Sequence, residues 1–194
     1  MSKVELHPQT LLIPLPAAMV SCQAEGYKPN IITIAWIGIV NSEPPMLSIS
    51  VQPKRYSYQI IKKSGQFVVN VTSENNLKEA DFCGNRSGKD YDKFKELNLT
   101  PLPGKMVSVP LIKECPINLE CLVRNSLLLG THEMFIAEIV AVHIDQELLD
   151  NHNRPDIDKL KPLVYCTGAQ EYRGGFTELL GRYGQAVGKK TKPS

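Results

Sequence analysis

Most of the first half of the chain consists of short apolar runs separated by glycine, proline, asparagine or serine. This pattern predicts strands at residues 17–23, 31–40, 46–51 and 66–72. Few intervals between these runs are long enough for a crossover helix. Because consecutive parallel strands need such crossovers, the close spacing favours antiparallel hairpins and a barrel over a doubly wound parallel sheet.

The second half contains the clearest alternation of apolar and polar positions. Between residues 117 and 123 the odd positions are apolar and the even positions are mostly polar, which predicts a strand with one buried face. A second β-rich run, residues 134–144, follows Gly130. We therefore expect a long hairpin over residues 117–144 that turns near Gly130, and a last strand at residues 163–166.

Helical patterns are few and short. They predict helices at residues 57–63, capped by Ser57, at 75–83, ending at Gly84, at 90–97, after a Ser87-x-x-Asp90 capping box, and at 176–187. No internal repeat or linker divides the chain. The expected fold is mainly β, a β-barrel with a few short peripheral helices, in one domain over residues 1–194.

Charge and composition narrow the class of protein. The formal net charge of +2 is too small to favour a nucleic-acid binder. The first residues lack the basic segment and apolar core of a signal peptide, and no apolar stretch approaches membrane-spanning length. We therefore expect a cytoplasmic protein that binds neither nucleic acid nor membrane.

The cysteines and histidines do not have the spacing of a metal site. The five cysteines are scattered and never occur as Cys-x-x-Cys, so we interpret them as reduced thiols. His143, Asp145 and His152 remain a less favoured alternative as a ligand set. No metal ligand is expected.

Common catalytic signatures are also absent from the sequence. It has no Gly-x-Ser-x-Gly elbow, no Walker-type phosphate loop and no Rossmann glycine fingerprint. Hydrolases, nucleoside triphosphatases and ordinary dehydrogenases are therefore disfavoured. The remaining candidates are three segments with polar residues where apolar strands end or helices begin.

The first segment, residues 50–57, leads from a buried strand into a helix. Free backbone N–H groups at a helix start, together with Lys54, Arg55 and the Ser57 hydroxyl, are suited to a phosphate group. The alternative is an ordinary helix cap with Lys54 and Arg55 facing water.

The second and third segments suggest a loop over a ligand and a surface for a flat ring. Residues 83–94 form a glycine-containing loop that leads to Lys93, which can supply positive charge; the alternative is a capped surface helix. Residues 30–36 place Thr33 and Ala35 on one face of a strand, where an aromatic ring can approach the backbone. The alternative for Trp36 is a core aromatic residue.

Together these segments resemble the flavin reductase-like family, the FMN-binding split barrels that include flavoredoxin. The matching motifs, in the same order and spacing, are Pro14-Leu15-Pro16, Asn30-x-x-Thr33-x-Ala35-Trp36, Asn41-Ser42-Glu43-Pro44-Pro45, Ser50-x-x-Pro53-x-Arg55-x-Ser57 and Ser87-Gly88-Lys89-x-x-Asp92-Lys93-Phe94. The resemblance implies a six-stranded antiparallel split barrel that forms a homodimer with FMN near the subunit interface.

The resemblance also implies where FMN binds. The expected cofactor-binding residues are Asn30, Thr33, Ala35, Trp36, Ser50, Lys54, Arg55, Ser57, Ser87, Lys93, His132 and Tyr165. No catalytic acid or base is required, because FMN carries the redox chemistry. The implied function is an oxidoreductase that passes reducing equivalents from NADH, NADPH or an electron-carrier protein. The alternatives are a non-enzymatic FMN electron carrier, and a barrel with a degenerate site that serves only as an interaction protein.

Overall fold

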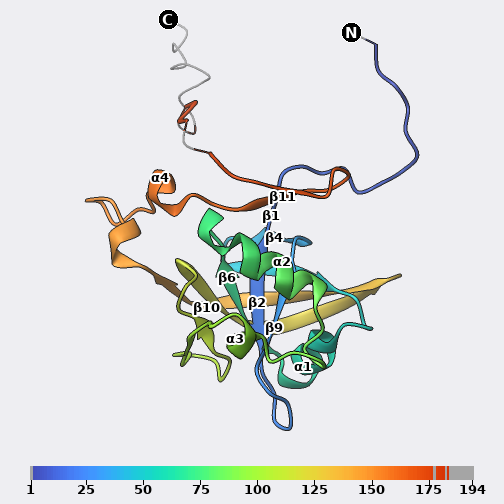
Figure 1. Ribbon diagram of the computed structural model, residues 1–194, viewed down its shortest axis with the longest axis vertical. Helices are drawn as coiled ribbons and strands as arrows, with labels where there is room; N and C mark the ends of the chain where they lie inside the picture. Colours follow the sequence, from blue (N-terminus) through green and yellow to red (C-terminus); the bar gives the residue numbers. More distant parts are fainter. Residues whose placement is uncertain (1, 177, 182, 184–194) are drawn as a thin grey trace, which may run out of the picture.

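The computed structural model describes residues 2–176, 178–181 and 183 (Figure 1). Its strands are β1 (Leu15–Pro16), β2 (Ala18–Cys22), β3 (Asn30–Ile34), β4 (Ile37–Asn41), β5 (Met46–Val51), β6 (Gln66–Val71), β7 (Pro101–Leu102), β8 (Leu111–Ile112), β9 (Ile117–Leu129), β10 (His132–Ile144), β11 (Val164–Cys166) and β12 (Glu171–Arg173). Its helices are α1 (Tyr56–Ser64), α2 (Leu77–Asn85), α3 (Lys93–Glu96) and α4 (Ile157–Leu160), with short 3₁₀ turns η1 (Glu74–Asn76) and η2 (Gln146–Leu148).

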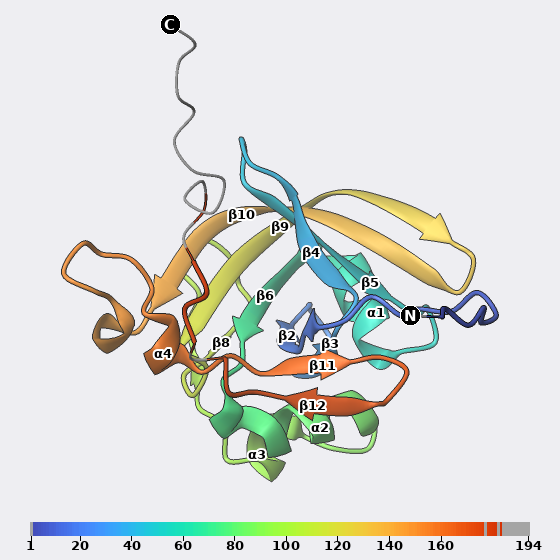
Figure 2. The same cartoon turned by 90° about the horizontal axis from the view of Figure 1, so that it is seen from above.

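The main sheet confirms the mainly β, antiparallel prediction. Seven strands follow one another in the order β3-β2-β6-β9-β10-β5-β4, and the sheet curls into a half-barrel (Figure 2). Two small sheets, β1-β11-β12 and β7-β8, accompany it. The strand count differs from the expected six because the predicted strand at residues 31–40 divides into β3 and β4.

The division between β3 and β4 determines the geometry of the sheet. The chain bends at Ala35 and Trp36, where the Ile37 N–H donates to the Ala35 carbonyl at 3.0 Å. The Trp36 carbonyl accepts from the Ser50 N–H at 2.9 Å, which holds the bend against β5. Although consecutive in sequence, β3 and β4 are therefore the two outermost strands of the sheet.

The long hairpin agrees with its prediction. Strands β9 and β10 pair antiparallel and turn at Gly130 and Thr131, where Gly130 has a φ of 54°, in the left-handed region that glycine adopts readily. Two register shifts along the pair increase its curvature. The hairpin thereby wraps around one side of the half-barrel (Figure 2). The pairing of Glu133 with Val51 brings the neighbouring His132 close to β5.

Helix ends differ from the predictions. Arg55, not Ser57, is the N-cap residue of α1, and α2 continues through Gly84 to Asn85. The cap of α3 is Asp92, whose carboxylate accepts from the Lys95 N–H at 3.4 Å. The Ser87 hydroxyl instead accepts from the Lys89 N–H within a turn, so the expected capping box at residues 87–90 is wrong. In the expected helix at 176–187, residues 176, 178–181 and 183 are not helical, and the others lie outside the described residues.

Two apolar clusters lie on opposite sides of the strands. One fills the half-barrel and includes Phe67, Phe135 and Ile49; the other packs β2 and β3 against α2 and α3, with Met19 and Phe94 among its members. Burial of such large side chains supplies the main stabilising free energy. Strand β3 is thus held from both sides while its outer edge remains available to a ligand. Within the described part of the chain, no helix is long and apolar enough to cross a membrane.

A buried carboxylate attaches α1 to the hairpin. Glu133 is only 5% exposed and accepts hydrogen bonds from the Tyr58 hydroxyl at 2.6 Å and from the Lys62 ammonium. The Lys62 hydrogen bond above all lowers the pKa of Glu133 to about 2. Because the pKa in the folded state lies below the ordinary 4.5, this contribution to stability is complete above that value and is lost as the pH falls toward 2.

We therefore expect Glu133→Gln to reduce the acid sensitivity of the fold. The free energy of unfolding, measured by denaturant titration at about pH 6 and about pH 3, should differ less between the two pH values than it does in the unchanged protein. Glu138→Gln is the matched control, because Glu138 lies on the same strand and pairs with Arg124 at a more exposed position. An unchanged pH difference in Glu133→Gln would contradict the proposed role of this carboxylate.

Candidate functional site

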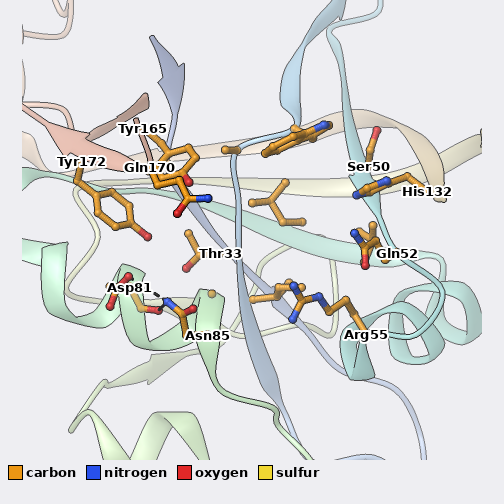
Figure 3. Close-up of a pocket in the computed structure, with 17 residues that line it drawn as sticks. Thr33, Ser50, Gln52, Arg55, Asp81, Asn85, His132, Tyr165, Gln170 and Tyr172 are labelled. Atoms are coloured by element: carbon orange, nitrogen blue, oxygen red, sulfur yellow. Dashed lines mark hydrogen bonds between the residues drawn. The ribbon is translucent and has the colours of Figure 1, made fainter. Parts of the chain in front are cut away.

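Two adjoining cavities lie along the outer edge of β3. Figure 3 shows the larger of them. The larger has a volume of about 490 Å³, within the range of small-molecule sites, and the smaller about 210 Å³. Ile32, Arg55 and Gly84 line both cavities, so the two spaces lie next to each other. A single ligand with two chemically different ends can therefore occupy both.

The structure brings all twelve expected site residues to the walls of these cavities. The larger cavity is lined by Thr33, Ala35, Trp36, Ser50, Arg55, His132 and Tyr165. The smaller is lined by Asn30, Lys54, Arg55, Ser57, Ser87 and Lys93. The aromatic members of the set all line the larger cavity, and both lysines line the smaller one.

In the larger cavity, two rings from distant elements lie nearly parallel. The planes of Trp36 and His132 differ by 3°, with centroids 6.3 Å apart. Trp36 is 41% exposed, so it is not a core aromatic residue. The bend after β3 places Trp36 here, and the β9–β10 turn places His132. Together they provide flat surfaces at one end of the cavity.

The edge of β3 offers backbone groups to the cavities. Strand β3 pairs with β2 on one side only, and the carbonyl of Ile31 on its other side accepts from the Lys93 ammonium at 2.6 Å. By the period of two, the backbone groups of Thr33 lie on the same outer edge. Such edge groups can form hydrogen bonds with a flat heterocycle placed beside the strand.

The smaller cavity is built around a buried polar pair. The Asn30 side-chain amide donates to the Ser57 hydroxyl at 2.8 Å, and both residues are almost completely buried. Ser57 therefore connects α1 to β3 rather than capping the helix, which corrects the sequence prediction. Gly88 covers this pair closely: a Cβ at Gly88 would lie 2.1 Å from the Asn30 side-chain oxygen. The close approach requires glycine in this loop.

Lys93 lies deeper than the sequence suggested. It lies in the first turn of α3, within the predicted helix at 90–97, is 2% exposed, and donates to the carbonyls of Ile31 at 2.6 Å and Cys83 at 2.8 Å. Its ammonium has three N–H groups, so one remains for a ligand in the smaller cavity. Burial lowers the pKa of Lys93. Lys93 thus connects β3 to α2 by hydrogen bonds in addition to lining the smaller cavity.

Positive charge concentrates at the junction of the two cavities. Arg55 lines both, and in the described part of the chain its side chain forms no hydrogen bond or ion pair. The first N–H groups of α1, at Tyr56 and Ser57, have no partner within the helix. A guanidinium beside free helix N–H groups is suited to an anionic oxygen group.

Several lining residues were missed from the sequence: Gln52, Asp81, Asn85, Arg86, Gln170 and Tyr172. Asp81 and Asn85 are one turn apart on α2, so their i,i+4 spacing places them on one helix face, a signal that was available. Gln170 and Tyr172 belong to the β11–β12 hairpin, and no local pattern indicated that this hairpin reaches α2.

His143, also considered as a metal ligand, contacts Glu120 instead. Within residues 2–176, 178–181 and 183, no three potential ligands cluster around a metal position.

Comparison with known proteins identifies the family. Residues 10–174 match the model of the flavin reductase like domain. The chain belongs to the flavin reductase-like family. A relative from Archaeoglobus fulgidus, an uncharacterized protein, is 37% identical over 131 residues, which cover 68% of this chain and 73% of the relative. This match is independent of the cavity geometry.

Solved structures of the family have the same architecture. Flavoredoxin of Desulfovibrio vulgaris (Miyazaki F) is 33% identical, with a TM-score of 0.91 over 96% of this chain and 100% of that one. An FMN-binding protein from Thermus thermophilus is 22% identical, with a TM-score of 0.78 over 94% of this chain and 98% of that one, which shows a shared fold. The expected resemblance to flavin reductase-like split barrels is therefore confirmed.

Proposed function

We propose that the chain binds FMN across the two joined cavities and acts as an oxidoreductase of the flavin reductase or flavoredoxin type. The observation that carries this proposal is the division of the site into two parts. One part is cationic and closed by a glycine loop, and the other is a flat space beside an edge strand. FMN has the same division, an anionic phosphate joined to a planar ring system.

The residues present fit the phosphate in the smaller cavity. Arg55, Lys54 and the first N–H groups of α1 offer positive charge, and Ser87 with the Gly88 backbone lines the opposite wall. Lys93 has one N–H group not used by the carbonyls of Ile31 and Cys83. We propose that these groups hold the phosphate and that the buried Asn30–Ser57 pair fixes the distance between α1 and β3.

The residues of the larger cavity fit the planar ring system of FMN. Thr33 and Ala35 are small enough to let a ring approach the edge of β3, and Trp36 and His132 supply flat surfaces beside it. Bound FMN supplies the capacity to accept and donate reducing equivalents. The protein's own part is to orient the ring, exclude water from one side of it, and place Ser50 and Tyr165 within the same cavity.

We propose NADH or NADPH as the electron donor, with an electron-carrier protein as the alternative donor. The experiment is FMN titration of the purified protein, followed by anaerobic addition of NADH or NADPH while the flavin absorbance is recorded. Rapid loss of absorbance with either nucleotide supports the enzyme. Loss only with a protein donor supports an FMN electron carrier, and no uptake of FMN at micromolar concentration contradicts the whole proposal.

We further propose that the chain works as one domain, in the cytoplasm, and as a homodimer. The apolar side chains of Leu127, Leu128 and Leu129 are exposed at the end of β9, and Leu129 pairs with His132 of the cavity wall. Leu127 and Leu129 lie on one face of the strand and Leu128 on the other, and exposed apolar side chains are typical of subunit interfaces. Sedimentation equilibrium tests the dimer, and a monomeric mass at micromolar concentration would contradict it.

A further inference from the structure

The β11–β12 hairpin forms part of the wall of the larger cavity without belonging to the main sheet. Together with β1 it makes a separate three-stranded sheet, in the order β1-β11-β12. Its residues Tyr165, Gln170 and Tyr172 line the cavity, and Figure 3 shows them on the side opposite His132. We call residues 163–175, which contain the hairpin, the flap.

Both ends of the flap are fastened at one residue, Glu74, at the start of η1. The Glu74 N–H donates to the Lys161 carbonyl at 2.9 Å, just before the flap begins. The Glu74 carboxylate accepts from the Gly175 N–H at 2.5 Å, where the flap ends. The first attachment joins two main chains and is reinforced by the bridge between Ser73 and Pro162. The second depends on a single side chain, and we call this Glu74–Gly175 contact the latch.

The flap has the features of a segment that opens locally. Strand β1 pairs with β11 over two residues, and β11 pairs with β12 over three. Strand β12 is the outer strand, and residues 168–171 at the turn are exposed. Tyr165 and Tyr172 pack only at the margin of the apolar cluster beneath α2. Short pairings with an exposed turn open at a lower free energy than the core of a sheet.

Two consecutive glycines bring the end of the flap against Glu74. A Cβ at Gly174 would lie 2.3 Å from Oε1 of Glu74. Gly175 has a φ of 78°, in the left-handed region that glycine adopts readily. The main chain can therefore turn closely against Glu74 and present the Gly175 N–H to it. Neither Glu74 nor Gly174 lines a cavity, so any effect of these residues on ligand binding is indirect.

We infer that the flap is a gate for FMN and that the hydrogen bond between Glu74 and Gly175 holds this gate closed. The inference rests on the proposed function, because it assigns FMN to the cavity that the flap lines. Opening of the flap withdraws three wall residues together, so that the ring can pass between solvent and cavity. The latch acts on the flap and not on the ligand. It therefore slows both the entry and the release of FMN.

The test measures both rates in the purified full-length chain. FMN is mixed rapidly with excess protein at several protein concentrations while flavin fluorescence is recorded. The slope of the observed rate constant against protein concentration gives the rate constant of binding, and the intercept gives that of release. In Glu74→Ala we expect each to rise about tenfold, because a hydrogen bond to a charged acceptor is lost. The dissociation constant should change by less than about threefold, because the two rates rise together.

Three further variants separate the latch from the turn in which Glu74 lies. Glu74→Gln keeps a side-chain oxygen that can accept from the Gly175 N–H, so its rates should lie nearer to those of the unchanged protein than to those of Glu74→Ala. Asn75→Ala removes an exposed neighbouring side chain of η1 and should leave both rates unchanged. Gly174→Ala releases the latch from the flap side, because the added Cβ displaces the Glu74 carboxylate. It should raise both rates, and it replaces Glu74→Ala if that variant does not fold.

Unchanged rates in folded Glu74→Ala and Gly174→Ala would overturn the inference. So would a faster release with an equal loss of affinity, because that pattern indicates a damaged wall and not a gate. Amide hydrogen exchange of residues 164–173 should also be faster in Glu74→Ala than in the unchanged protein, and equal protection there would count against the gate. Failure of the unchanged protein to bind FMN contradicts the proposed function itself, whereas normal binding with unchanged rates contradicts only the gate.

Discussion

Replacing Arg55 with alanine is expected to weaken FMN binding about a hundredfold without changing the free energy of unfolding. Charge-assisted hydrogen bonds to an anionic group contribute about 1.5–3 kcal/mol, which corresponds to roughly one to two powers of ten in affinity. The guanidinium lines both cavities and has no partner among the described side chains, so the fold does not depend on it. Isothermal titration of the FMN-free protein with FMN measures the effect.

Two further variants separate charge from geometry at this position. Arg55→Lys keeps the charge but loses the planar fork, so its affinity should lie between those of the unchanged protein and Arg55→Ala. Lys113→Ala removes a surface charge outside the cavities and should bind FMN normally. Undiminished FMN affinity in Arg55→Ala would remove this residue from the phosphate site.

Replacing Gly88 with alanine is expected to lower both stability and FMN affinity. The added Cβ would lie 2.1 Å from the buried Asn30 side-chain oxygen, so either the loop or the Asn30–Ser57 pair must move. Forced displacement of packed groups typically costs about 1–3 kcal/mol. Because the displaced groups line the smaller cavity, FMN affinity should fall more than about tenfold. Thermal unfolding of the FMN-free protein and FMN titration measure the two effects separately.

Gly38→Ala is the control for this substitution. No atom lies within 4 Å of a Cβ at Gly38, which is on β4 away from the loop, so stability and FMN affinity should both remain close to those of the unchanged protein. Normal FMN binding by Gly88→Ala would show that the loop can retreat, and that close contact between Gly88 and Asn30 is not needed for the cofactor.

The strands were predictable because their signals are local. The predicted strand at residues 46–51 coincides with β5, and the hairpin at 117–144 coincides with β9 and β10 together with their turn. In each case alternation or an apolar run is bounded by turn-forming residues. These features act within a few residues of the position they specify.

The bend between β3 and β4 had no such signal. Residues 31–40 form a nearly continuous apolar run, and neither Ala35 nor Trp36 favours a turn. The bend is held instead by the hydrogen bond from the Ser50 N–H to the Trp36 carbonyl, a contact between different strands. Long-range contacts of this kind override local propensity.

The candidate site was likewise predictable only in part from local sequence signals. The sequence motifs predict twelve site residues, and the structure places these twelve around the two cavities. Their role in holding FMN stays a prediction. Asp81 and Tyr172 are 91 residues apart in sequence and meet only because the β11–β12 hairpin packs against α2. No spacing rule in one sequence could have paired them.

The position of β3 and β4 at opposite margins of one sheet has a consequence for the energetics of cofactor binding. The larger cavity is lined by residues of β3, at one margin of the sheet, and of β5, which lies next to β4 at the other margin. A molecule bound there contacts both strands and therefore holds the two sides of the open half-barrel together. At a free concentration one hundred times its dissociation constant, a ligand of the native state adds about 2.7 kcal/mol of stability. Local opening of β3 should then become rarer, and amide hydrogen exchange along this strand should slow when the cofactor is present.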